Sequence, residues 1–132
     1  MKLIDNMLMD SVTGKARESS RMRMNLNFHG SLEDKCHRLL NAMEPGTEIP
    51  VHRHKTKDEG IILLRGCIRV NIYNDRGEVT ESVVLSHKDG RVGVDIPMME
   101  WHGVECLESG SVIYEVKEGP FMPHDADDIL KV

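Results

Sequence analysis

From Gly46 onward the chain is a succession of short apolar–polar alternations interrupted by turns. Residues 68–73 alternate in this way, and the following Asn74-Asp75-Arg76-Gly77 has the composition of a hairpin turn, with glycine where a left-handed residue is needed. No helical periodicity separates the segments, so the sequence predicts an all-β barrel or sandwich. The predicted strands lie around residues 61–64, 68–73, 79–85, 92–96 and 111–117.

The first 45 residues follow another pattern. Asp5 can cap a helix over residues 6–17, and residues 22–28 alternate like a half-buried strand. Residues 36–43 fit a strand or a helix, and we favour a strand because Pro45-Gly46 follows at once. We therefore expect one structural domain, with residues 1–45 as a helix-and-strand arm that packs on a barrel of residues 46–132. The expected apolar stripe of the helix is Ile4, Leu8, Val12 and Ala16.

Composition narrows the function classes. The net charge is −5 and no stretch has a block of one sign, which argues against nucleic acid or an anionic membrane as the partner. The longest apolar run, residues 61–64, is too short to span a bilayer, and Asp5 and Asp10 interrupt any signal-peptide core. We expect a cytoplasmic protein whose three cysteines are free thiols. They are Cys36, Cys67 and Cys106.

Three histidines and one glutamate have the spacing of a metal site. Pro50 disfavours a helix, so His52 and His54 lie in an extended segment and project from the same face. Glu59 opens the next strand, and His102 stands at the start of a later one. Three imidazoles and a carboxylate suit one divalent Fe, Mn, Ni, Co or Zn ion, with positions open for water or substrate.

A solvated His-x-His on a strand edge is the alternative, and the wider spacing argues against it. The run from Gly46 through His52, His54 and Glu59 to Gly66 resembles the first motif of the cupin superfamily. The second motif is matched by Pro97, Met99 and His102, with Met99 where the family has glycine and Cys106 where asparagine is common. The resemblance implies a cupin fold, which is a double-stranded β-helix or jelly-roll barrel.

A finer resemblance extends over nearly the whole chain. It implies membership of the WbuC family, cupin-fold metalloproteins often encoded in bacterial surface-polysaccharide clusters. The family's reaction is not established, so the resemblance suggests only a link to sugar metabolism. The segments that carry it are residues 23–29, 38–42, 45–47, 52–54, 95–97, 101–102 and 115–120.

The function predicted from these features is a metal-binding cupin that acts on or binds a small molecule, such as a sugar or nucleotide-sugar derivative. As an enzyme it would be isomerase-like or epimerase-like, or an Fe(II) oxygenase. The alternative is a binding module whose metal orients a ligand without turnover. A metal-free epimerase would have no use for the four ligands. We find no second carboxylate or tyrosine at a diagnostic spacing for a general base, so enzymatic activity stays open.

Several polar residues have two interpretations each. Asn25 and Asn27 share one strand face. They either line the mouth of a pocket or lie at the edge of the sheet, and we favour the edge. Cys106 shares the face of His102 and is expected in the core. Arg38 and Arg65 have two interpretations: they bind an anionic substrate, or they are exposed to solvent. We favour exposure to solvent. Glu115 and Lys117 are expected to pair across strands. No partner at ligand spacing is found for His29, His37, His87 or His124.

Two further expectations concern the surface. Residues 61–64 are apolar on both faces of their strand, so the outer face needs a cover. Either the N-terminal arm or a partner barrel must supply it, and we predict a homodimer. The segment after Pro120 carries several aspartates and is expected to be a loosely held end.

Overall fold

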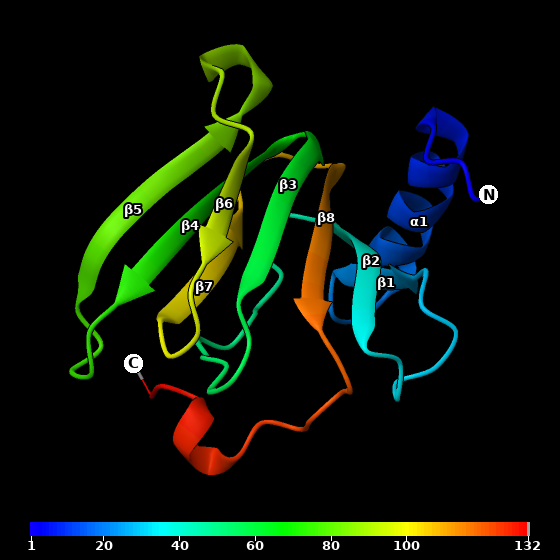
Figure 1. Ribbon diagram of the computed structural model, residues 1–132. Helices are drawn as coiled ribbons and strands as arrows, with labels where there is room; N and C mark the ends of the chain where they lie inside the picture. Colours follow the sequence, from blue (N-terminus) through cyan, green and yellow to red (C-terminus); the bar gives the residue numbers. More distant parts are fainter. Residues whose placement is uncertain (132) are drawn as a thin grey trace.

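The computed structural model describes residues 1–131, in which an N-terminal helix precedes eight strands (Figure 1). The helix, α1, spans Asn6–Glu18. The strands are β1 (Arg23–Asn27), β2 (Cys36–Met43), β3 (Glu59–Arg65), β4 (Cys67–Tyr73), β5 (Val79–Ser86), β6 (Gly93–Ile96), β7 (Trp101–Cys106) and β8 (Ser111–Glu118). Single 3₁₀ turns lie at His87–Asp89 and Ala126–Asp128.

The strands form two antiparallel sheets that face each other. One has the order β1-β2-β8-β3-β6, and the other has the order β5-β4-β7. The main apolar core fills the space between the two sheets, with Ile61 and Leu63 from β3 meeting Ile68 and Val70 from β4. The predicted all-β, two-sheet architecture is confirmed. No helix within residues 1–131 is long and apolar enough to cross a membrane.

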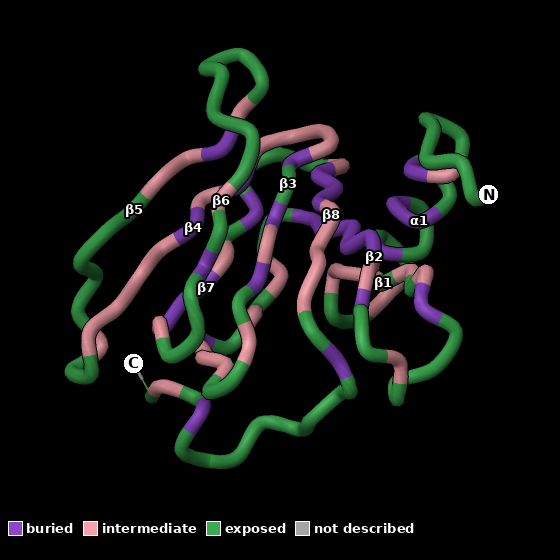
Figure 2. Tube along the Cα trace, viewed as in Figure 1, coloured by how far each residue is buried: buried purple, intermediate pink, exposed green. Residues whose placement is uncertain are grey.

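Helix α1 covers the outer face of the larger sheet (Figures 1 and 2). Asp5 caps it as expected, because its carboxylate accepts a hydrogen bond from the Leu8 backbone N–H at 2.9 Å. The expected apolar stripe is partly wrong: Ile4 precedes the helix and is exposed, while Met9 and Thr13 belong to the buried face. Met9, Val12 and Ala16 pack on side chains of β2 and β8 in a second apolar cluster.

The N-terminal strands extend the sheet of the barrel. Strand β2 pairs with β8 over its whole length, from Cys36 opposite Glu118 to Met43 opposite Ser111. The ambiguous segment is thus a strand, as favoured. β1 forms the sheet edge, where Asn25 and Asn27 are exposed rather than lining a pocket. The division of the chain at residue 45 stays a prediction.

The outer face of β3 is only partly covered. Leu64 packs against the cluster under α1, so the N-terminal arm supplies its cover. Ile62, on the same face, stays 45% exposed. The homodimer stays a prediction, which light scattering of the full chain at high concentration would test.

The C-terminal segment is not a loosely held end, and that expectation was wrong. It crosses below one end of the barrel and returns to the His52 segment (Figure 1). Leu130 N–H donates to the Val51 carbonyl at 2.8 Å, and Arg53 N–H donates to the Asp128 carbonyl at 3.1 Å. We call residues 120–131 the tail. These contacts matter for function because Val51 and Arg53 flank His52.

Candidate metal centre

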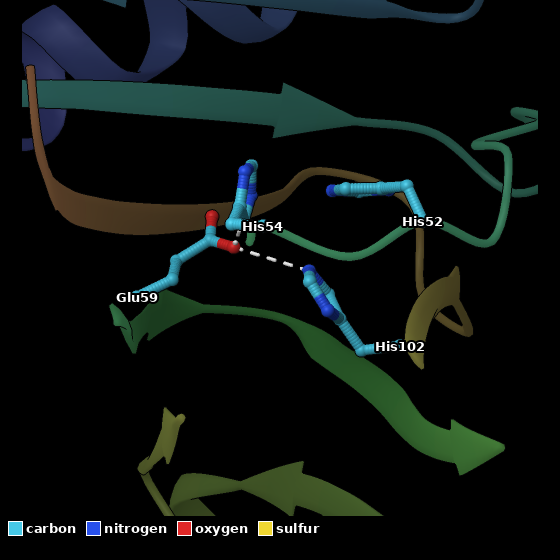
Figure 3. A group of neighbouring side chains, drawn as sticks. All are labelled: His52, His54, Glu59 and His102. Atoms are coloured by element: carbon cyan, nitrogen blue, oxygen red, sulfur yellow. Dashed lines mark hydrogen bonds and ion pairs between the residues drawn. The ribbon is translucent and has the colours of Figure 1, made fainter. Parts of the chain in front are cut away.

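The structure brings the four predicted residues together at one end of the barrel (Figure 3). Each offers one donor atom, and these atoms all lie within 4.8 Å of one another. His52 and His54 come from the extended segment before β3, Glu59 is the first residue of β3, and His102 is the second residue of β7. Glu59 and His102 are almost fully buried. The spacing thus predicted the convergence of these side chains.

Backbone carbonyls fix the orientation of two imidazoles. His52 Nδ1 lies 2.8 Å from the Pro50 carbonyl, and His102 Nδ1 lies 3.0 Å from the Glu100 carbonyl. A carbonyl only accepts, so each Nδ1 carries the proton and donates. In the neutral form of either ring, Nε2 is then an unprotonated nitrogen, which is the state that a metal requires.

Charge is concentrated on Glu59. Its Oε2 lies 3.1 Å from His102 Nε2 and 3.4 Å from His54 Nε2. Burial raises the pKa of Glu59, but the hydrogen bond from His102 outweighs burial and holds the pKa below its usual range. Burial likewise opposes the charged form of His102, yet the bond to Glu59 raises the pKa of this histidine. The carboxylate is therefore ionised and ready to accept a cation.

The pKa of His52 shifts in the opposite direction from that of His102. Burial, helped by the nearby His102, lowers the pKa of His52 to about 4. Its imidazole is therefore neutral at physiological pH, as a metal ligand must be.

The four side chains fit a divalent metal ion. Nε2 of His54 is buried, and within residues 1–131 its one polar contact is the long approach of Glu59 Oε2 at 3.4 Å, which does not form a regular hydrogen bond. A buried polar atom that is so poorly paired is costly unless something else binds it. Donors at about 2.1 Å from one ion lie at most about 4.2 Å apart, so a small inward movement of these side chains would complete a coordination sphere. Neutral nitrogens and a carboxylate oxygen also match the preferences of first-row transition metals. The cluster could hold such an ion.

The glycine that ends the first motif has a steric reason. Gly66 has a φ of +86°, and a Cβ there would lie 2.6 Å from the Cα of Ser111. Only glycine allows this backbone conformation together with this close approach of β3–β4 to β8.

Met99 departs from the second motif, but the turn of that motif is still formed. Met99, where cupins have glycine, adopts the left-handed conformation with a φ of +73°. Its N–H donates to the His54 carbonyl at 2.7 Å. The turn geometry is thus kept, at the expense of backbone strain, and it connects the second motif to a residue of the first.

A cavity of about 360 Å³ adjoins the cluster at His54. The loop of residues 53–57 forms one wall, and the tail forms the other. His124 of the tail lies over the site, with its ring centroid 4.7 Å from that of His52 and 5.3 Å from that of His54. His124 is not one of the four donors, in agreement with its lack of a partner at ligand spacing, but the folded tail brings its ring beside two of them.

Sequence reasoning also missed a second carboxylate beside the site. Glu115 lies opposite Ile61 on β3, and since cross-strand partners share a face, its side chain points into the barrel. Burial raises the pKa of Glu115, and the nearby Glu59 raises it further. Lys117, two residues on, lies opposite Glu59. Lys117 thus has an acid opposite it, as cross-strand pairing requires, but within residues 1–131 neither Glu115 nor Lys117 forms an ion pair. The alternation of residues 111–117 in the sequence was the signal that could have placed Glu115 on an inward face of this strand.

Other candidate residues have structural roles. Cys106 is buried in the core, where its thiol donates to the Met43 carbonyl at 3.4 Å. Arg65 pairs with Asp10 of α1 at 2.6 Å, which leaves it no role in the metal centre. His29 and His37 stack on each other at 4.0 Å, and His87 Nε2 lies 2.7 Å from the Leu63 carbonyl.

Comparison with known proteins supports the fold. A family model described as a domain of unknown function (DUF6016) matches residues 4–85, more than half of the chain. KdgF from Halomonas sp. is 17% identical with a TM-score of 0.58, over 80% of this chain and 84% of KdgF. CapF, a capsular polysaccharide assembling protein from Staphylococcus aureus, is 20% identical with a TM-score of 0.64, over 86% of this chain but only 33% of CapF.

The cupin domain of Schizosaccharomyces pombe Cnp3 is 13% identical with a TM-score of 0.59, over 75% of this chain and 66% of that one. No curated protein matches the chain. At these identities the structures establish the cupin fold alone, and the finer resemblance to the WbuC family stays a prediction.

Proposed function

We propose that this chain, which belongs to the DUF6016 family, is a cytoplasmic, metal-dependent cupin. Its substrate would be a sugar or nucleotide-sugar derivative of surface-polysaccharide metabolism. The observation that carries the proposal is the convergence of His52, His54, Glu59 and His102, whose donor atoms lie within 4.8 Å of one another. Without an ion, the buried Nε2 of His54 has only the 3.4 Å approach of Glu59 Oε2 and no regular hydrogen bond within residues 1–131.

The same four residues would hold one Fe, Mn, Ni, Co or Zn ion. When bound, the ion supplies a Lewis acid that polarises a carbonyl or alcohol oxygen of the substrate. Carbonyl hydrogen bonds to His52 and His102 keep these rings oriented, and the barrel interior keeps bulk water away from Glu59.

Glu115 favours an enzyme over a binding module. It is a second carboxylate inside the barrel, near Glu59 and His102, and its raised pKa suits a group that exchanges protons near neutral pH. In an isomerisation, its carboxylate would take the proton from the carbon next to the substrate carbonyl. The carboxyl group would then return a proton to the former carbonyl carbon, while the hydroxyl proton moves between the two substrate oxygens, so the reaction has no net change in charge. Exchange of the carboxyl proton with solvent between these two transfers would place solvent hydrogen on the carbon.

The suggestion of a sugar rests on two supports. One is the sequence resemblance to the WbuC family. The other is the fold shared with CapF, whose name describes capsular polysaccharide assembly, although the chain spans only a third of CapF.

Elemental analysis of protein purified without an affinity tag tests the metal. We expect about one ion per chain in the wild type, its loss in His54→Ala, and its retention in His87→Gln, since His87 is exposed and lies outside the cluster. A wild-type chain that takes up none of the five ions on reconstitution would refute the proposal.

Deuterium incorporation separates the enzyme from the binding module. We would incubate the metal-loaded chain in D₂O with a panel of keto and aldehydo sugars and follow carbon-bound deuterium by NMR. The wild type should exchange at least one sugar, and Glu115→Gln should keep its metal but lose exchange. Sugar binding without exchange in the wild type would instead support the binding module.

A further inference from the structure

Two lysines beside the metal centre have no ion-pair partner. Lys57, in the loop before β3, and Lys117, in β8, are both half-buried. Within residues 1–131, neither ammonium has a carboxylate oxygen within 4.0 Å, although Arg53, Lys55, Arg65 and Arg69 all do. Partly buried charges without a partner are costly, so the pair points to a missing anion.

The backbone places the two lysines in the same part of the molecule. Lys57 precedes Glu59 by two residues, and Lys117 stands opposite Glu59 in the β3–β8 ladder. Nζ of Lys57 donates to the Pro120 carbonyl at 2.6 Å, which holds it at the start of the tail.

The cavity connects Lys57 to the metal centre, and Lys117 stands opposite Glu59, one of the four donors. Lys57 and His54 both line the cavity of about 360 Å³, and His124 lines the opposite wall. Two acids of this region are engaged elsewhere: Asp128 pairs with Lys55 at 3.4 Å, and Glu59 is bonded to His102. A metal ion at the four donors would add further positive charge, so the cavity favours a negatively charged ligand.

We propose that the substrate carries a carboxylate or phosphate group, bound by Lys57 and Lys117, while a neighbouring oxygen of the same molecule reaches the metal. This inference rests on the proposed metal centre and narrows its substrate class to anionic sugar derivatives. A charged anchor besides the metal also fixes the orientation of the substrate, which a metal alone does not.

Isothermal titration of the metal-loaded full chain tests the anion site. The probes are D-glucuronate, D-glucose and inorganic phosphate at low ionic strength; the two sugars differ only in a carboxylate replacing the hydroxymethyl group. Glucuronate or phosphate should bind at least tenfold more tightly than glucose, and added salt should weaken the binding. Preference for glucuronate indicates a carboxylate, and binding of phosphate indicates a phosphate group.

Matched variants show whether the two lysines are responsible. Lys57→Gln and Lys117→Gln should each weaken anion binding about tenfold or more, while Lys57→Arg and Lys117→Arg keep the charge and should retain it. Lys88→Gln, at an exposed lysine in the turn after β5, is the control and should bind as the wild type does.

The metal content of each sample distinguishes the two proposals. Loss of metal from the wild type refutes the proposed function. Normal metal content with anions binding no more tightly than glucose, or with both glutamine variants binding as the wild type does, overturns the anion site alone.

Discussion

His52 and His102 donate their backbone N–H groups to each other's carbonyl oxygens, at 3.1 and 2.9 Å, although they come from distant parts of the sequence. This reciprocal pair joins the two cupin motifs directly at the site. It also brings the two imidazole centroids within 4.4 Å of each other. Backbone pairing therefore sets the relative position of two of the four donors.

Chelation should destabilise the wild-type chain. An ion that binds only the folded state stabilises it by about 2.7 kcal/mol at a hundredfold excess over Kd. Since about 1 kcal/mol corresponds to roughly 2–8 °C for domains near this size, a chelator should lower Tm by several degrees in calorimetry. His54→Ala should show no response to the chelator. A response of equal size in this variant would contradict the ligand set.

The metal-free chain should lose stability between about pH 6.5 and pH 4 because of His52. Folding lowers its pKa from near 6.5 to about 4, so in this window the unfolded state binds more protons, and stability falls with falling pH. The full effect is about 3 kcal/mol or less by this linkage. His102, whose pKa is raised, acts in the opposite sense: it stabilises at low pH and loses this contribution as pH rises.

Urea unfolding in chelator at several pH values measures this effect. His52→Gln keeps a donor for the Pro50 carbonyl but does not titrate, so its stability should fall less than that of the wild type over the same window. Equal slopes in the two proteins would show that His52 is not responsible.

Met99→Gly should stabilise the chain. Met99 is 49% exposed and left-handed, a conformation that costs a non-glycine residue roughly 1–2 kcal/mol. The larger entropy of unfolded glycine offsets part of the gain, so we expect about 1 kcal/mol in denaturant unfolding. Met98→Gly, at a neighbour that is 46% exposed but outside the left-handed region, should destabilise. If Met99→Gly and Met98→Gly changed the free energy of unfolding in the same direction, backbone strain at Met99 would be refuted.

Gly66→Ala should be strongly destabilising, by about 2 kcal/mol or more, because of its left-handed backbone and the clash with Ser111. Gly14→Ala is the matched control: Gly14 lies within α1 and a Cβ there meets nothing within 4 Å. Alanine should stabilise that helix by about 0.5–1 kcal/mol. Thermal melts of the two variants should therefore shift in opposite directions.

Asp128→Asn should loosen the tail without unfolding the barrel. The buried Asp128 carboxylate lies 3.6 Å from the Arg53 guanidinium and 3.4 Å from Lys55 Nζ. Its neutralisation should speed hydrogen exchange at the Leu130 amide, which bonds to Val51, while the core amide of Leu63 stays protected. Asp127→Asn, at an exposed neighbour that forms no ion pair within residues 1–131, should leave both rates unchanged.

The sequence by itself determined the strands, the helix cap and the convergence of the four site residues. These features depend on short-range rules: alternation decides which residues face inward, Asp5 caps the helix after it, and Pro50 keeps His52 and His54 extended. Because Glu59 opens β3 and His102 lies at the start of β7, motif spacing was enough to bring all four donors to one end of the barrel.

Only the tertiary structure decided what surrounds those four residues. Glu115 and Lys117 become part of the site because β8 pairs with β3 in one register, and a shift of one residue would have turned both outward. The tail has no apolar periodicity that could have predicted its docking. It is placed by backbone hydrogen bonds to Val51 and Arg53 and by the ion pairs of Asp128, and neither kind of contact leaves a periodic pattern in the sequence. For that reason no sequence signal predicted that His124 lies beside the metal centre.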